Sequence, residues 1–300
     1  MKTIAILGAT ASGKTSLSIK LAQEFNAQIL SLDSLSIYKE IDIASAKPLV
    51  TEREGIKHFG IDELSPNENF SVSLFFDIYK NAYEDTIKKD KNLIIVGGTG
   101  FYLKSLLSGL STKLPISSQT KQQVKNILQN RDEAFDMIER YDKKYAQKIS
   151  YNDTYRIEKW LELYLQSGMG ASEYFAKFKK KPLIEDIDIF EIETSKDILN
   201  QRISQRTDEM IKKGLIDEVV WLEKKYTRRP NSMRSIGIKE TLEFLDGFID
   251  RDELANKISQ NTSRLAKRQR TFNSTQFPPH IKGDLENLYH SIHKSKIFSA

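Results

Sequence analysis

The 300-residue sequence predicts an α/β protein, in which helices flank a parallel sheet and an all-helical subdomain is inserted into the chain. Short, continuous apolar runs at residues 3–7 and 93–96 lead directly into glycine-rich turns, as buried strands of a parallel sheet do. Residues 114–185 are instead polar, charged and prone to form helices, with few runs that are typical of strands. These observations together place a helical segment within an α/β core.

The first apolar run ends at Gly8, and helix-forming sequence with its apolar side chains on one stripe follows at residues 14–25. A strand, a glycine loop and a helix are therefore predicted at the start of the chain. The later elements of the core are predicted in the order strand, helix, strand, helix and strand: residues 29–32, 75–88, 93–96, 101–107 and 187–192.

Two longer helices are predicted in the last third of the chain. Ser195 is a suitable N-cap for the first of them, and Gly214 follows its last turn as expected of a C-cap. The second helix begins near Asp250, with Glu253 as its capping-box partner. The two prolines at residues 278–279 are expected to end the ordered chain.

The composition excludes several classes of protein. The chain has no Cys and four His, which excludes disulfides, cysteine-ligated zinc and a cysteine nucleophile, and disfavours a multi-histidine metal site. No apolar run approaches the roughly 18 residues that a membrane span needs, and the apolar stretch after Met1 is too short for a secretion signal. We expect a monomeric cytoplasmic protein without membrane contact, whose net charge of +5 is compatible with an anionic partner.

Residues 8–15 form the most specific motif, which we call the phosphate loop. They fit G-x-x-x-x-G-K-[ST] at every fixed position, between a predicted strand and a predicted helix. Backbone N–H groups of such a loop surround phosphate oxygens, and the helix directs its positive end at the same point. Lys14 adds a full charge, and the Thr15 hydroxyl can hold Mg²⁺. The predicted diphosphate or triphosphate site consists of Gly8, Ala9, Thr10, Ala11, Ser12, Gly13, Lys14 and Thr15.

This motif predicts a P-loop NTPase-like parallel sheet flanked by helices. The catalytic core is predicted to comprise residues 1–113 and 186–300, with the helical insertion at residues 114–185. Enzymes with this loop often place a metal-holding acid after a later strand, but residues 97–99 contain none. Asp33 follows the second strand instead, and Thr99 follows the third, so both are expected beside the phosphate loop. Asp33 could be a general base, a Mg²⁺ ligand or only the cap of the next turn.

Basic residues on two predicted helices suggest further anion contacts. Arg202 and Arg206 are four residues apart, so they share a helix face and could neutralise pyrophosphate. Their spacing by itself favours the alternative, a solvated face on which they pair with nearby acids. Lys257, Arg264, Lys267 and Arg268 lie near one stripe of the last long helix, which suits either a phosphate backbone or solvent. Basic and aromatic residues also alternate at residues 174–181, which suits single-stranded RNA or the core of a helical subdomain.

The sequence resembles the tRNA dimethylallyltransferases, the isopentenyl-tRNA transferases that modify the adenosine 3′ to the anticodon. The resemblance spans nearly the whole chain and begins with the phosphate loop. The sequence departs from the family's pattern at Ala44-Ser45, Phe59-Gly60, Lys159-Trp160 and Phe272. Further blocks follow in the family's order, at residues 33–38, 42–48, 70–72, 96–102, 152–156, 202–206, 214–219, 234–237 and 265–269.

The resemblance implies that the substrates are dimethylallyl diphosphate and the anticodon stem-loop of a tRNA, with Mg²⁺ as cofactor. The N6 atom of adenosine 37 would attack C1 of the dimethylallyl group, and pyrophosphate would leave. Asp33 would be the general base, and Thr99 would form a hydrogen bond near the scissile bond. Lys14, Arg206 and Mg²⁺ at Thr15 would stabilise the leaving pyrophosphate, with Arg202 supporting it.

The matching segments also imply an RNA path, into which the adenosine would be flipped out of its stack. The inserted helices would grip the anticodon stem-loop. A P-loop kinase of a small molecule or nucleotide is the alternative, and a non-catalytic RNA-binding protein with a vestigial loop is a third class. The residues implied in RNA binding are Asp33, Ser34, Leu35, Ser36, Thr99, Tyr155, Arg156, Ile157, Glu158, Lys159, Arg234, Ser235, Ile236, Gly237, Ile238, Lys239, Lys267 and Arg268.

Overall fold

The computed structural model describes residues 1–109, 111, 114–178, 181–295 and 298. It divides into two compact units, which we call the core unit and the helical unit. The core unit comprises Met1–Ser105 and Ile184–Ala300, and the helical unit comprises Leu106–Leu183. The sequence placed these boundaries at residues 113–114 and 185–186, and residue 113 lies outside the described residues.

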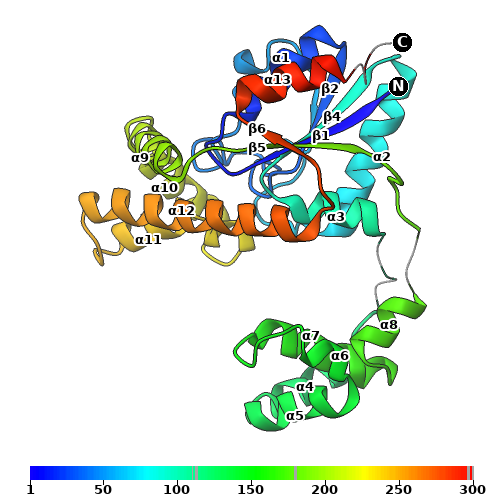
Figure 1. Cartoon of the computed structure of the whole chain (residues 1–300). Helices are drawn as coiled ribbons and strands as arrows, with labels where there is room; N and C mark the ends of the chain where they lie inside the picture. The colour runs from blue at the N-terminus through cyan, green and yellow to red at the C-terminus, as the bar shows by residue number, and fades with distance from the viewer. Residues whose placement is uncertain (110, 112–113, 179–180, 296–297, 299–300) are drawn as a thin grey trace. The chain divides into compact units, whose positions relative to one another are not determined.

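A six-stranded sheet of order β3-β2-β4-β1-β5-β6 forms the centre of the core unit (Figure 1). Every pairing in this sheet is parallel, as predicted. The central strands are buried along almost their whole length, because helices cover both faces. The strands are β1 (Thr3–Gly8), β2 (Ala27–Ser31), β3 (His58–Phe59), β4 (Asn92–Gly97), β5 (Asp188–Ile192) and β6 (Ile281–Gly283).

Alternate side chains of the strands meet different helical layers. Ile6 and its neighbours pack against α1 and α13, which lie together over one face of the sheet (Figure 1). On the opposite face, Gln28 donates to Asp85 of α2 at 3.0 Å, and Asn273 of α12 donates to Glu191 at 3.0 Å. Helix α3 (Gly100–Ser108) begins in this unit and ends in the helical unit. The other helices of this unit are α1 (Lys14–Glu24), α2 (Val72–Lys88), α9 (Lys196–Lys212), α10 (Leu215–Tyr226), α11 (Ile238–Leu245), α12 (Arg251–Gln276) and α13 (Leu285–Lys294).

The predicted caps of the two longer helices are confirmed. Ser195 accepts from the Ile198 amide at 3.4 Å and begins α9. Gly214 follows α9 with a φ of 102°, a left-handed conformation that glycine adopts without steric cost. The Asp250 carboxylate accepts from the Glu253 amide at 2.8 Å, and the Glu253 side chain accepts from the Asp250 amide in return, so the capping box of α12 is complete.

The prediction that residues 278–279 end the ordered chain is wrong. Strand β6 pairs with β5, and α13 follows it. Leu288 and Ile292 of α13 are buried in the same cluster as Leu17 and Leu21 of α1. Tertiary burial therefore stabilises this last segment, whose short strand has little local preference of its own.

The helical unit has its own small core. Trp160 of α7 is 1% exposed, and its indole N–H donates to the Asp142 carboxylate at 3.1 Å. The departure from the family pattern at this position is thus an internal packing residue. None of the helices in the described ranges is both long and apolar enough to cross a bilayer. The helices here are α4 (Ser118–Ile127), α5 (Arg131–Tyr141), α6 (Lys143–Ala146), α7 (Thr154–Ser167) and α8 (Ala171–Lys177).

Candidate active site

The phosphate loop connects β1 to α1 at the carboxyl end of the sheet. Gly13 has a φ of 90°, and a Cβ atom there would lie 2.8 Å from a Leu285 methyl carbon, so only glycine fits. Ser12 is 1% exposed, and its hydroxyl has no hydrogen-bond partner within the described part of the chain. Because buried polar groups are seldom unpaired, a hydroxyl without a partner in this loop fits a site that is completed by a ligand.

Lys14 places its charge beside the loop. Its ammonium group donates to the Ala9 carbonyl at 3.1 Å, across the loop. Burial lowers the pKa of Lys14 to about 8, the nearby Asp33 carboxylate opposes this shift, and the Arg206 guanidinium adds to it. A phosphate group bound at the loop would provide a negatively charged partner for the Lys14 ammonium group.

The structure shows one of the three roles that the sequence left open for Asp33, that of a cap. Its Oδ1 atom accepts from the amides of Leu35 and Ser36 at 2.8 and 3.0 Å, so the side chain caps the next turn. The same side chain lines two cavities at the carboxyl end of the sheet. The cap holds the carboxylate in a fixed orientation, which a general base also requires.

These two cavities bring together the four side chains that were predicted to be catalytic. A cavity of about 240 Å³ is lined by Asp33, Thr99 and Arg206, together with apolar side chains that include Ile203 and Ile236. A smaller cavity of about 80 Å³ is lined by Lys14, Thr15, Asp33 and Arg206. Asp33 and Arg206 border both spaces, so an anion on the loop and a reactant in the larger cavity would meet beside them.

Arg206 reaches the site from α9. Its Nη2 atom donates to the Ala46 carbonyl at 2.8 Å, and burial lowers the pKa of its guanidinium, with Asp33 opposing that shift. Arg202 is more exposed, and its Nη1 atom lies 3.5 Å from the Ser12 carbonyl of the phosphate loop. Neither arginine forms a salt bridge with Asp208 or Glu209 in the described ranges, so the geometry supports a role for both at the anion site.

Two residues of α12 were not predicted to belong to the site. The Thr10 amide of the phosphate loop donates to the Gln269 side chain at 2.9 Å. A Cβ atom at Gly98 would collide with the same Gln269 amide group, which explains the glycine after β4. Ala266, one turn earlier, packs with Ala9 and Ile203 in a small buried cluster. Helix α12 therefore fixes the phosphate loop and α9 relative to each other. The family block at residues 265–269 was the sequence feature that could have indicated this role of α12.

The segments predicted to bind RNA differ in exposure. Ser235 and Ile236 line the larger cavity, and Ser34 and Leu35 line it from the side of β2. Arg234, Lys239, Lys267 and Arg268 are exposed on the core unit, whereas Ser36 and Gly237 are buried there.

In the helical unit, Tyr155 is 70% exposed, Arg156 pairs with Asp153 at 2.7 Å, and Lys159 pairs with Glu162 at 2.8 Å. The side chains of Ile157 and Ile238, two residues predicted to bind RNA, are fully buried within their own units. Of the basic run at residues 177–181, residues 179 and 180 lie outside the described residues.

A phosphate loop after β1, with polar side chains around cavities at the carboxyl ends of the strands, defines a P-loop NTPase-like α/β protein. The model of the IPP transferase family matches residues 36–276 of this chain. A tRNA dimethylallyltransferase from Aliarcobacter butzleri is 53% identical over 294 residues, which cover 98% of this chain and 99% of that protein. The chain therefore belongs to the IPP transferase family.

Solved structures agree with this assignment. A tRNA delta(2)-isopentenylpyrophosphate transferase from Staphylococcus epidermidis superimposes with a TM-score of 0.69 at 32% identity, covering 98% of this chain and 97% of that one. A eukaryotic dimethylallyltransferase described as acting on tRNA superimposes with a TM-score of 0.79 at 28% identity, covering 91% of this chain and 70% of that one. The predicted P-loop NTPase-like fold is confirmed.

Proposed function

We propose that this protein transfers the dimethylallyl group of dimethylallyl diphosphate to N6 of adenosine 37 in tRNA, forming N6-isopentenyladenosine and pyrophosphate. The observation that supports this most directly is the meeting of a phosphate loop, a fixed carboxylate and a half-buried arginine at adjoining cavities. Relatives that match almost the full chain are named tRNA dimethylallyltransferase.

The diphosphate would bind at the phosphate loop, held by backbone amides, Lys14 and the two arginines of α9. Negative charge develops on the departing pyrophosphate as the C1–O bond breaks, and fixed cations in a partly buried site stabilise that charge strongly. Residues 202 and 206 approach the loop from α9, while Lys14 approaches it from α1. This arrangement would make leaving-group stabilisation the main contribution of the core unit to catalysis.

Mg²⁺ fits the donor chemistry of the loop. Thr15 borders the smaller cavity, and the described residues contain no cluster of three or more His, Asp or Glu side chains that could hold a metal alone. Mg²⁺ commonly binds through one or two protein oxygens and the phosphates of a substrate. Bound in this way, it would supply further positive charge to the leaving group.

Asp33 would receive the proton that leaves N6. As the new N6–C1 bond forms, the electron pair of the C1–O bond departs with pyrophosphate, and the N6 proton passes to the Asp33 carboxylate. The backbone amides of Leu35 and Ser36 occupy one side of Oδ1 and so fix the direction in which the carboxylate points. Thr99, which lines the same cavity, would donate a hydrogen bond near the reacting bond.

The tRNA would reach the cavity with its adenosine flipped out, which costs less in an unpaired anticodon loop than in a duplex. Exposed basic residues of the core unit would contact phosphates, and the exposed face of α7 in the helical unit would grip the anticodon stem-loop. We further propose that the protein acts as a monomer in the cytoplasm, which accords with its lack of cysteine.

One assay tests the proposal and its alternatives. The protein is incubated with Mg²⁺, dimethylallyl diphosphate and unmodified tRNA, and the nucleosides are analysed by mass spectrometry for a C5 addition to adenosine. In a parallel incubation with ATP, a kinase would instead release ADP and leave the tRNA unchanged. A binding protein with a vestigial loop would retain tRNA equally well after Lys14→Ala and would form no product in either case.

A further inference from the structure

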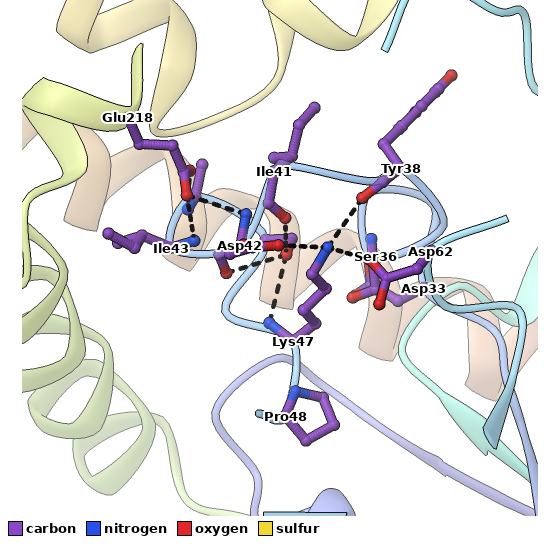
Figure 2. Close-up of polar contacts among 12 residues, drawn as sticks. Asp33, Ser36, Tyr38, Ile41, Asp42, Ile43, Lys47, Pro48, Asp62 and Glu218 are labelled. Atoms are coloured by element: carbon purple, nitrogen blue, oxygen red, sulfur yellow. Dashed lines mark hydrogen bonds and ion pairs between the residues drawn. The ribbon is translucent and has the colours of Figure 1, made fainter. Parts of the chain in front are cut away.

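Glu218, near the start of α10, closes a turn that borders the active site. Its Oε2 atom accepts from the amides of Asp42 and Ile43 at 2.9 and 2.7 Å, and Oε1 accepts from the Ala44 amide at 2.9 Å (Figure 2). Successive backbone amides that converge in this way form an anion-binding concavity. Here the anion is a carboxylate of the same chain, so the contact fixes the backbone of residues 41–46, which we call the 41–46 turn.

Lys47 holds the other side of the turn. Its ammonium group donates to the Tyr38 carbonyl at 3.0 Å and forms ion pairs with Asp42, at 2.6 Å, and with Asp62 (Figure 2). The Lys47 side chain is only 5% exposed, so its charge is stable there because these partners surround it. Glu218 and Lys47 thus hold the same short segment from two directions.

The 41–46 turn also fixes the position of Arg206. Ala46 has a φ of 47°, a conformation that a residue with a Cβ atom adopts only when its surroundings impose it. In this conformation its carbonyl accepts from Arg206 Nη2 at 2.8 Å. Ala44, Ser45 and Ala46 also line the 240 Å³ cavity. The direction of the guanidinium group therefore depends on the backbone that Glu218 fixes.

We propose that Glu218 is a positioning residue, which orients Arg206 toward the pyrophosphate group through the 41–46 turn. This inference rests on the proposed function, in which Arg206 contacts the diphosphate. Glu218→Gln keeps the size of the side chain but replaces one acceptor oxygen by an NH₂ group, which faces amides that are also donors. The turn would then lose at least one hydrogen bond and shift away from Arg206.

The chain offers a matched control in Asp217. Both acids lie in the first turn of α10, where each stabilises the positive end of the helix, but Asp217 is exposed and makes no hydrogen bond to the 41–46 turn in the described ranges. Glu218→Gln and Asp217→Asn therefore change the net charge and the helix terminus alike. They differ in the contact with the turn.

The test measures the affinity for inorganic pyrophosphate by calorimetry in the presence of Mg²⁺, together with steady-state kinetics. We expect Glu218→Gln to weaken pyrophosphate binding about tenfold, as loss of charge-assisted hydrogen bonds does, and to raise the KM for dimethylallyl diphosphate similarly. The KM for tRNA should stay within about twofold, and Asp217→Asn should match the wild type in all three quantities. Wild-type pyrophosphate affinity in a folded Glu218→Gln protein would overturn the proposal.

A double-mutant cycle with Arg206→Ala distinguishes positioning from a general structural role. If Glu218 acts through Arg206, Glu218→Gln will have no further effect on pyrophosphate binding once Arg206 is removed. Equal losses in both backgrounds would contradict the proposal. Should Glu218→Gln fail to fold, Glu218→Asp enters the same cycle, because it withdraws the carboxylate by one methylene and is expected to lose affinity only while Arg206 is present.

The cycle also separates this inference from the proposed function, because pyrophosphate binding needs no turnover. If the cycle shows the coupling but the wild-type protein forms no isopentenyladenosine, the proposed reaction is refuted and the positioning role remains supported. If the wild-type protein forms the product but the cycle shows no coupling, only the positioning role is refuted.

Discussion

The two units of this protein place their charges differently. In the core unit, Lys14, Arg206 and Lys47 are largely withdrawn from solvent and bind backbone carbonyls at 3.1, 2.8 and 3.0 Å. In the helical unit, Arg156 and Lys159 are exposed and pair with acids three residues away on the same helix. Cations that are buried or half-buried and held by fixed partners suit stabilisation of a developing charge, whereas exposed local pairs contribute little to stability and can exchange partners. The comparison indicates that the core unit is preorganised for chemistry and that the helical unit offers an adaptable surface.

The largest expected effect concerns the stability of the helical unit. Trp160→Ala should destabilise this unit by about 3–5 kcal/mol, because it empties the centre of a small core and leaves Asp142 without its indole donor. Hydrogen exchange of α7 amides measures this loss, and pyrophosphate affinity should be unchanged if the two units are independent. Tyr155→Ala, at an exposed position of the same helix, is the control. A matching loss of pyrophosphate binding in Trp160→Ala would contradict the independence of the two units.

The next effect concerns the base in the core unit. Asp33→Ala should lower kcat by at least about 100-fold while tRNA affinity is retained, because removal of a general base affects the chemical step. Asp33→Asn separates the two roles of this residue, since its amide oxygen can still accept from the amides of Leu35 and Ser36 but cannot take a proton. A loss in Asp33→Ala that Asp33→Asn restores would assign Asp33 to capping alone. Single-turnover kinetics with a modified-nucleoside readout measures both variants.

The third prediction uses the pKa of Lys14, which burial lowers to about 8. Below this pH the side chain of the free protein is charged and attracts pyrophosphate, and above it the side chain becomes neutral. The affinity for pyrophosphate should therefore fall about fivefold more between pH 8 and pH 9 in the wild type than in Lys14→Arg, which stays charged. Calorimetric titrations across pH 7–9 would measure the difference. Parallel pH profiles for the two proteins would contradict a buried, titrating Lys14.

The smallest effect is expected on the exposed surface of the core unit. Replacing Lys267 and Arg268 by alanine should flatten the dependence of log tRNA affinity on log salt concentration by about 1.5, because two phosphate contacts are lost. Lys257→Ala is the matched control on the same helix, since Lys257 already pairs with Glu243 at 3.0 Å. Filter binding at several salt concentrations gives the slopes. A slope unaltered by the double substitution would assign Lys267 and Arg268 to the solvated face of α12.

The accuracy of the predictions drawn from the sequence follows the range of the interactions involved. The caps of α9 and α12 and the central strands β1, β2, β4 and β5 depend on neighbouring residues, and these were predicted. Helices α10, α11 and α13 were not predicted, and α13 is stabilised by apolar contacts with α1 at the other end of the chain. The burial of Ile157 and Ile238 was likewise missed, because both residues lie in segments whose matching family blocks implied RNA contact.

The sequence by itself determined the phosphate loop. Its glycines, lysine and threonine act through the loop backbone and through the helix that directly follows the loop in the chain, so neighbouring residues are sufficient to define it. It also determined the α/β class, since continuous apolar runs between glycine turns permit few other folds. Only the tertiary structure decided which contacts between distant residues build the site around that loop: Gln269 at the Thr10 amide, Arg206 at the Ala46 carbonyl and Glu218 at the 41–46 turn. Such contacts join residues more than 150 positions apart, and their geometry follows from helix packing, which no local pattern specifies.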